Sequence, residues 1–509
     1  MNRRTFLKHL AAAPAAAAAV AHLTSPRTAR AEAVAAAPAA SVAPGAQAAP
    51  AASVAPAALS SPASPPALAR PNVVLFLVDD QGYGDMALHG NPHCRTPHMD
   101  ALAQQAVELV DFHVSPVCAP TRASLMTGRY NFRTGVTDVY GDACCMKPEE
   151  VTLAEALRAA GYATGVFGKW HLGDEKPHRP MDQGFDESLV FKGPALRKYV
   201  DPPVFLNGKP KAVKGYCTDI FVDHAIDFVR RNKDRPFFVY VPTNLIHTPL
   251  QVPESYSAPF KALGLDDKTA VIYGMLKNVD DNLGRLRAAL ADLGLDGNTL
   301  FVYTSDNGPC AGSVTPGRFM AGLHGLKGTP FENGIRTPCF MRWPKGFECR
   351  GRVDRLAAHI DIMPTVLDAC GVAPPAGVKL DGTSLMPLLR RHDAAWPDRT
   401  LFFQWDGGPE PHRGMAYAVR TQQYKLVQPA GAAGPPNQQH IRDRYTQLCE
   451  AQGRGALTLV GEPRHLLFDV AADPGETCDL AARHPDLVAK LRQQYEAWFD
   501  DVWTSWHGP

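Results

Sequence analysis

The stretch Asn72-Val-Val-Leu-Phe-Leu-Val78-Asp79-Asp80 decides the fold class, because a continuous apolar run leads directly into two carboxylates. Such a run is typical of a short strand buried on both faces of a parallel sheet. A second run, Thr299-Leu-Phe-Val-Tyr303, leads in the same way into Thr304-Ser305-Asp306-Asn307-Gly308. Because sites in such sheets lie beyond the carboxyl ends of the strands, both ends are predicted to carry site residues.

Strand-like runs alternate with amphipathic helical patterns along the chain. Helices are predicted over 97–107, 219–231 and 268–293, and strands over 162–167 and 236–241. The alternation predicts an α/β fold in which helices sandwich a large, mostly parallel sheet, at residues 71–385. Short strands over 401–405 and 415–427, then a helix over 486–499, predict a smaller C-terminal α+β domain with an antiparallel sheet at 386–509.

Composition is that of a globular protein. The 509 residues are 45% hydrophobic and 20% charged, which allows a large core. The net charge of +1 hides an asymmetry, because residues 1–31 carry five basic side chains and no acid. The remaining chain is mildly acidic and shows no electrostatic footprint for nucleic acid.

The N-terminus is predicted to be an export signal. Asn2-Arg3-Arg4-Thr5-Phe6-Leu7-Lys8, an alanine-rich stretch and Ala29-Arg30-Ala31 resemble a twin-arginine signal peptide over residues 1–31. This resemblance implies a periplasmic or secreted protein that contacts the twin-arginine machinery transiently. A membrane anchor is disfavoured, because Pro14 and His22 interrupt the roughly 20 apolar residues that a span needs. No other stretch suits stable membrane insertion, and the Ala/Pro-rich residues 32–70 are predicted to be a disordered linker.

The chain has eleven cysteines and no Cys-x-x-Cys pair, which argues against a zinc ribbon or a thioredoxin-type centre. In an oxidising compartment, Cys339 and Cys349 are the most local candidates for a disulfide. The connectivity stays open.

The carboxylates after the two strands suggest a metal site. Paired carboxylates beyond buried strands repel each other unless a cation lies between them. A ligand set made of oxygens alone favours calcium or magnesium. The alternative is that Asp79, Asp80, Asp306 and Asn307 are solvated turn or helix-capping residues.

The segment Cys118-Ala-Pro-Thr-Arg122-Ala-Ser-Leu-Met-Thr-Gly128 predicts a short helix that starts near Cys118, and a helix start suits an anion. It resembles the signature of the type I sulfatases, an arylsulfatase-like family of the alkaline phosphatase-like superfamily: Cys-x-Pro-Ser/Thr-Arg followed by Thr-Gly. In that family a formylglycine-generating enzyme oxidises the cysteine to Cα-formylglycine, whose hydrate attacks the sulfur of a sulfate ester. The alternative is a structural cysteine before an ordinary helix.

Three further blocks follow in the family's order. Gly165-Val-Phe-Gly-Lys169-Trp-His171-Leu-Gly173 is similar to its Gly-Lys-Trp-His-Leu-Gly block, and in an extended backbone Lys169 and His171 share a face. His247-Thr-Pro249 resembles its His-x-Pro block. The third is Lys327-Gly-Thr-Pro-Phe-Glu332-Asn333-Gly-Ile-Arg336, in which Asn333 replaces a glycine. Asparagine tolerates a left-handed backbone, so the turn is expected to persist.

The resemblance implies the roles of the site residues. Asp79, Asp80, Asp306, Asn307 and the modified residue 118 bind one divalent ion, usually calcium, with magnesium as the other option. Lys169 neutralises the site, His171 is the base that helps to expel sulfate, and Arg122 binds the hydrate or the sulfate. His247 and Lys327 assist the departing alcohol, whereas Glu332 and Arg336 form a loop-organising ion pair. The substrate is a small-molecule or glycan sulfate ester.

Two alternatives remain. A phosphonate monoester or phosphodiester hydrolase could use the same formylglycine, and an inactive secreted glycan-binding protein could retain the residues without the activity. Substrate selectivity is expected in loops, with 174–217 and 309–323 as candidates. Trp405, Asp406, His412 and Arg413 are further candidates for substrate contact.

Overall fold

The computed structural model describes residues 70–347, 350–429 and 464–507. The predicted signal peptide, the linker up to residue 69, Cys349 and Cys449 lie outside the described residues. Cys339, the other half of the suggested disulfide, is a buried free cysteine. Among the described residues, no helix combines the length and the apolar character needed to cross a membrane.

A ten-stranded sheet forms the centre of the fold. Its central strands β9, β1, β8, β4 and β5 are parallel, whereas β10, β6 and β7 pair antiparallel with their neighbours. The predicted mostly parallel sheet is therefore confirmed. Across the sheet the strands are β11 (Gly351–Val353), β2 (Val107–Leu109), β10 (Cys339–Arg342), β9 (Thr299–Ser305), β1 (Asn72–Val78), β8 (Phe237–Pro242), β4 (Ala163–Lys169), β5 (Glu187–Phe191), β6 (Val204–Leu206) and β7 (Lys209–Lys211).

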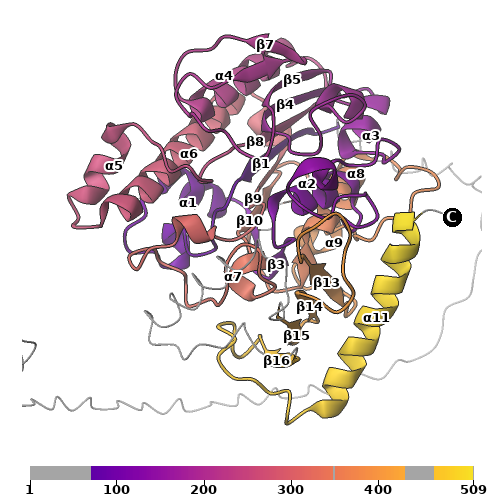
Figure 1. The fold of residues 1–509 in the computed structure, drawn as a ribbon. Coiled ribbons are helices and arrows are strands. Elements are labelled where there is room, and N and C mark those ends of the chain that lie inside the picture. The colour runs from indigo at the N-terminus through magenta and orange to yellow at the C-terminus, as the bar shows by residue number, and fades with distance from the viewer. Residues whose placement is uncertain (1–69, 348–349, 430–463, 508–509) are drawn as a thin grey trace, which may run out of the picture. The chain divides into compact units, whose positions relative to one another are not determined.

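Helices cover both faces of this sheet (Figure 1). Successive residues of a strand point to opposite faces, and both faces of the central strands are apolar, so each face packs against its own layer of helices. Val74 and Phe76 of β1 join one core, with α1 (Pro97–Ala103), α4 (Cys217–Arg231), α5 (Glu254–Lys261) and α6 (Asp267–Asp292). Val73 and Leu75 join the other core, with α2 (Cys118–Thr127), α3 (Leu153–Ala159), α8 (Ile362–Cys370) and α9 (Met386–Arg390).

The helix predicted over 97–107 is wrong at its C-terminal end. Helix α1 ends at Ala103, and Val107 is already the first residue of β2. Strand β2 lies between β11 and β10, so long-range strand pairing decides the conformation of this short segment.

A second, four-stranded antiparallel sheet lies in the C-terminal part, as predicted. Residues 415–427 form two strands rather than one, with a turn between them. The hydrophobic core around this sheet includes Leu326, Phe331 and Ile335, which flank or belong to α7 (Glu332–Ile335), so the sheet supports the loop that carries Lys327. Its elements are β13 (Leu401–Gln404), β14 (Tyr417–Arg420), β15 (Tyr424–Gln428), β16 (Leu466–Asp469) and α11 (Pro485–His507), and a separate two-stranded sheet pairs β3 (Phe112–His113) with β12 (Ala357–Ala358).

Candidate active site

The predicted acidic residues meet at one edge of the large sheet. Strands β1 and β9 are parallel neighbours with Val78 opposite Ser305, so Asp79, Asp80 and Asp306 leave the sheet side by side. The backbone N–H of Asp80 donates to Oδ1 of Asp306 at 3.1 Å. The side chains of Asp79, Asp80, Asp306 and Asn307 are all fully buried. The interpretation of these acids as solvated turn residues is therefore wrong.

Two lysines face these carboxylates. Lys169 is the last residue of β4, and its Nζ lies 2.6 Å from Oδ2 of Asp79. The Nζ of Lys327 pairs with Oδ1 of Asp80. Burial raises the pKa of Asp80, but Lys327 lowers it, with smaller contributions from His247 and Lys169, so the pKa lies below its usual value. Burial lowers the pKa of Lys327, whereas Asp80 raises it well above the ordinary value. The pair is therefore an ion pair.

Lys169 lies beside Asp79 because strand β4 packs closely against strand β8 at the preceding residue, Gly168. Gly168 has a φ of 138°, and a Cβ there would lie 1.9 Å from the carbonyl oxygen of Pro242 on β8. Only glycine permits this conformation and this contact. Gly168 is therefore needed for the close packing of β4 against β8, and Lys169 for its charge beside Asp79.

Helix α2 begins at Cys118, as predicted, and Arg122 follows one turn later. Burial raises the pKa of the Cys118 thiol, while Lys169 and Lys327 lower it by less. The guanidinium of Arg122 donates to Oδ2 of Asp306 through Nε at 3.1 Å and Nη2 at 2.6 Å. Its Nη1 donates to the carbonyl oxygen of Lys169 at 2.7 Å. Arg122 thus joins three parts of the site and holds Asp306 in place.

The extended-backbone argument for Lys169 and His171 is wrong. Strand β4 ends at Lys169, and His171 has a φ of 61°, so the chain turns before it. The Nε2 of His171 donates to the carbonyl oxygen of Val139 at 2.9 Å, and Nδ1 is buried without a hydrogen-bond partner in the described part of the chain. Burial and the charge of Lys169 hold the pKa of His171 well below its usual value. The ring is thus neutral, with Nδ1 as its basic atom.

His247 approaches the acids from the loop after β8. Its Nδ1 donates to the carbonyl oxygen of Thr248 at 2.6 Å, which leaves Nε2 as the acceptor atom of the neutral ring. This Nε2 lies 4.0 Å from Oδ2 of Asp80. Burial lowers the pKa of His247, and the charge of Asp80 opposes that effect. Nε2 of His247 is therefore placed to accept a hydrogen bond or to bind a cation.

The acidic residues fit a bound cation. Oδ1 of Asp79, Oδ2 of Asp80 and Oδ1 of Asn307 are buried and have no hydrogen-bond partner within the described residues. The amide nitrogen of Asn307 already donates to Asp80 and to the carbonyl oxygen of Gly308, so its oxygen is the free atom. Buried oxygens without partners are costly unless something else binds them. Ligand atoms of Asp79, Asp80 and His247 also lie within 4.8 Å of one another.

A pocket of about 470 Å³ opens above Cys118, Lys327 and His247. Both loops suggested for selectivity contribute to its wall, Pro194 and Ala195 from 174–217 and Ala311 from 309–323. Trp405 also lines it. The other candidates from that region are bound elsewhere: Nδ1 of His412 lies 2.8 Å from Asp406, and Arg413 pairs with Glu496 and Asp500 of α11.

The sequence analysis missed residues that hold the site together. Arg318, buried in the loop 309–323, pairs with Asp85 and donates to the carbonyl oxygen of Asp80 at 3.2 Å, where Asp80 has a φ of 62°. Asp85 could have been predicted as a site residue, because it lies a few residues after Asp79 and Asp80 in the sequence. Nothing in the sequence marks Val139, whose carbonyl group orients His171.

Asn333 also differs from expectation. It lies within helix α7 and is not among the residues with a left-handed backbone. Its amide nitrogen donates to the carbonyl oxygen of Gly325 at 3.0 Å. The side chain therefore stabilises the loop by a hydrogen bond, not by tolerance of a turn.

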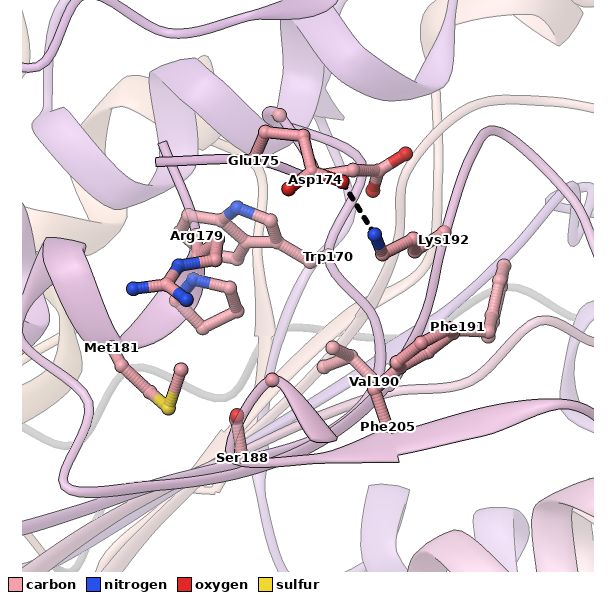
Figure 2. Close-up of a pocket in the computed structure, with 13 residues that line it drawn as sticks. Trp170, Asp174, Glu175, Arg179, Met181, Ser188, Val190, Phe191, Lys192 and Phe205 are labelled. Carbon is pink, nitrogen blue, oxygen red and sulfur yellow. Dashed lines mark hydrogen bonds and ion pairs between the residues drawn. The ribbon is translucent and has the colours of Figure 1, made fainter. Parts of the chain in front are cut away.

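A smaller pocket of about 60 Å³ lies between the segment after β4 and strands β5 and β6 (Figure 2). Its cations are already paired, Lys192 with Glu175 and Arg179 with Asp182. None of the predicted catalytic or metal-binding residues lines it, although most of its lining comes from the predicted selectivity loop 174–217. It is therefore separate from the candidate active site.

Comparison with known proteins identifies the family. Residues 71–372 match the family model described as Sulfatase. The chain belongs to the sulfatase family. Residues 323–432 also match the model of the C-terminal part of N-sulphoglucosamine sulphohydrolase. Human arylsulfatase A is 32% identical over 471 residues, covering 84% of this chain and 87% of that protein.

Solved structures share the fold of this chain. Ps i-CgsB in complex with k-i-k-neocarrahexaose has a TM-score of 0.72 and 27% identity, covering 84% of this chain and 93% of that chain. The phosphonate monoester hydrolase of Agrobacterium radiobacter has a TM-score of 0.57 and 21% identity, covering 84% of this chain and 96% of that chain, a likeness in fold alone. The alkaline phosphatase-like fold predicted for this sulfatase is therefore confirmed.

Proposed function

We propose that this sulfatase hydrolyses sulfate monoesters with a nucleophile made from Cys118, which is oxidised to Cα-formylglycine and hydrated. The observation that carries the proposal is the position of Cys118. It starts a buried helix, lines the pocket and lies close to the charges of Lys169, Lys327, Asp79 and Asp306. A formylglycine-generating enzyme is a transient partner in this proposal.

Asp79, Asp80, Asp306, Asn307 and the modified residue 118 would hold one divalent ion. The oxygen donors of the acids favour calcium, with magnesium as the other option. Support comes from the buried oxygens of Asp79, Asp80 and Asn307 that have no partner among the described residues. When bound, the ion would polarise the sulfate oxygens and favour ionisation of a nearby hydroxyl group.

The residues around the pocket divide the work. Residue 118 attacks sulfur with one hydroxyl of its hydrate, and the alcohol leaves. Lys327 and His247 line the pocket beside Cys118. The ammonium group of Lys327 can stabilise the leaving oxygen, and Nε2 of His247 can protonate that oxygen once the ring has taken up a proton. Lys169 offsets the charge of Asp79, and Arg122 keeps Asp306 and the end of β4 in register.

His171 would complete the cycle. Because its Nε2 donates to Val139, Nδ1 is the atom that can take a proton from the second hydroxyl of residue 118. Loss of that proton reforms the aldehyde and breaks the bond to the sulfate group, which leaves as inorganic sulfate. A low pKa keeps His171 unprotonated and ready for this step.

Two measurements test the proposal. The intact mass of the peptide around residue 118 should show an aldehyde or its hydrate in active protein, and an unaltered thiol in fully active protein would refute the chemistry. Turnover of 4-nitrophenyl sulfate should exceed that of a nitrophenyl phosphate diester. The opposite preference would favour the phosphonate monoester or phosphodiester hydrolase, whose support here is a likeness in fold.

An inactive glycan-binding protein is the remaining alternative. Sulfate release by the parent protein that disappears in Asp306→Ala would exclude it. Export by the twin-arginine route to the periplasm or beyond also belongs to the proposal. It depends on residues 1–31 and is tested by whether Arg3→Lys with Arg4→Lys keeps the protein in the cytoplasm.

A further inference from the structure

The active-site pocket has two chemically different parts. One part of its lining carries Cys118, Lys327 and His247, where the sulfate group is expected. The rest is mostly apolar or aromatic and includes Tyr140, Pro194, Ala195, Ala311 and Trp405. Among the described lining residues, only Lys327 and His247 can carry a positive charge, so the alcohol part of the substrate meets a wall without cations.

Asp138 adds a negative charge to this wall. Its Oδ1 accepts from the indole N–H of Trp405 at 3.1 Å and from the backbone of Val139 at 2.7 Å. Its Oδ2 accepts from the backbone N–H of Gly408 at 2.8 Å. All of these donors are neutral, so hydrogen bonding orients the carboxylate without cancelling its charge. A second anionic group on the substrate would be repelled here.

Tyr140 places an aromatic ring at the pocket with 66% of its surface exposed. The backbone beneath it is anchored, because the carbonyl of Val139 binds His171 and the hydroxyl of Thr137 donates to the carbonyl oxygen of Gly408 at 2.9 Å. An exposed ring on an anchored backbone offers a stacking face at little cost in chain entropy. A flat aryl group or the apolar face of a sugar matches that face.

We propose that this pocket selects singly sulfated, otherwise uncharged ring compounds, and that Tyr140 is a specificity-determining residue. The inference rests on the proposed hydrolysis of sulfate esters and narrows its substrates. The smaller pocket of Figure 2 offers no free cation for a second anion either, because its Lys192 and Arg179 are already paired with acids. The carboxylate of Asp138 thus disfavours a second anionic group on the substrate, and the ring of Tyr140 favours a flat ring compound.

Matched substrates test the charge rule. N-acetylglucosamine 6-sulfate and glucosamine 2-N,6-O-disulfate differ in whether the second substituent carries charge. We expect kcat/KM to be roughly tenfold or more higher for the neutral member. Equal or faster turnover of the disulfate would overturn the inference and leave the proposed function standing. Release of sulfate from none of the esters would instead refute the proposed function. Adding 4-methylumbelliferyl sulfate shows whether the ring is an aryl group or a sugar.

Variants test the residues. Tyr140→Ala should raise KM for the better neutral ester roughly tenfold with little change in kcat, and Tyr140→Phe should restore the low KM because it keeps the ring. Asp138→Asn should improve the relative kcat/KM of the disulfate. Leu263→Ala, which trims another exposed apolar side chain outside the pocket, is the control. An unchanged KM in Tyr140→Ala would contradict the role of Tyr140.

Discussion

Two of the buried charge clusters among the described residues differ in what remains unpaired. The first, the site cluster, is formed by Asp79, Asp80, Asp306 and Asn307. The second, the clamp cluster, joins α7 to the C-terminal sheet and is formed by Glu332, Lys425 and Glu476. Both contain buried carboxylates, and both depend on lysine.

The clamp cluster holds a cation against its carboxylates: Oε1 of Glu476 has no hydrogen bond of good geometry among the described residues, but it faces the Nζ of Lys425. The Nζ of Lys425 lies 2.9 Å from a carboxylate oxygen of Glu332 and 2.9 Å from one of Glu476. The backbone N–H of Glu332 donates to Glu476 at 2.8 Å, and His113 lies 3.2 Å from Glu332. In the site cluster, by contrast, Asp79, Asp80 and Asn307 each keep a buried oxygen without a partner in the described chain. The comparison teaches that buried charge is structural where protein groups close it and available for binding where they do not.

The largest expected effect comes from the site cluster. Asp80→Asn keeps the shape of the side chain and removes one charged ligand, so hydrolysis of 4-nitrophenyl sulfate should fall roughly a thousandfold. The melting temperature should fall as well, because Asp80→Asn removes the anionic partner of the buried Lys327. Steady-state kinetics measures the loss of activity, and thermal unfolding of the same samples measures the change in melting temperature. Retention of most of the activity would contradict the assignment of the site.

The clamp cluster should show its effect on stability. Lys425→Met removes the cation that lies 2.9 Å from both Glu332 and Glu476. Among the described lysines and arginines, Glu332 then keeps only the longer contacts with Arg336 and Arg420. This change should lower the free energy of unfolding by about 3–5 kcal/mol. Urea unfolding measures this change. Lys379→Met removes a lysine that is 62% exposed and pairs with Asp501, and it should cost at most about 1 kcal/mol. Similar decreases in the free energy of unfolding of both variants would contradict the expectation that the buried ion pair contributes more to stability than the exposed one.

Metal removal should separate the clusters again. A divalent ion present at a hundredfold its dissociation constant stabilises the folded state by about 2.7 kcal/mol, and a chelator should remove that amount from the parent protein. In Asp80→Asn the chelator should have a much smaller effect. In Glu476→Gln, whose site cluster is intact, it should act as in the parent. Calorimetric melting with and without chelator makes the comparison, and equal shifts in all three proteins would contradict it.

The smallest expected effect is a pH dependence of the clamp cluster. Burial raises the pKa of Glu476 to about 7 from the ordinary 4.5, with Lys425 opposing and Glu332 reinforcing the shift. The folded state therefore binds a proton that the unfolded chain releases, so this group's contribution to stability falls as pH rises between these values. Relative to Glu476→Gln, the parent should lose roughly 1–3 kcal/mol between about pH 5 and about pH 8. A pH-independent difference would count against this assignment.

The sequence predicts the site cluster well for a physical reason. Asp79 and Asp306 follow apolar runs, and parallel strands bring their carboxyl ends to the same edge of a sheet. The start of α2 at Cys118 is likewise a local feature. The position of His171 was predicted wrongly, because the chain leaves the extended conformation at Gly168 and His171.

The clamp cluster could not be predicted in the same way. The ion pair of Glu332 with Arg336 was expected and is present at 3.7 Å, but the closer partner, Lys425, comes from β15. Ninety-three residues separate Glu332 from Lys425, and only tertiary packing brings them together. The contact between Asp138 and Trp405, which shapes the pocket wall, depends on packing in the same way.

Native mass spectrometry of the chain after exchange into dilute calcium counts the ions that the unpaired oxygens of Asp79, Asp80 and Asn307 hold. We expect one divalent ion per chain in the parent and in Glu476→Gln, and none in Asp80→Asn. A parent protein that binds no ion, or an Asp80→Asn variant that binds it as fully as the parent, would contradict the account.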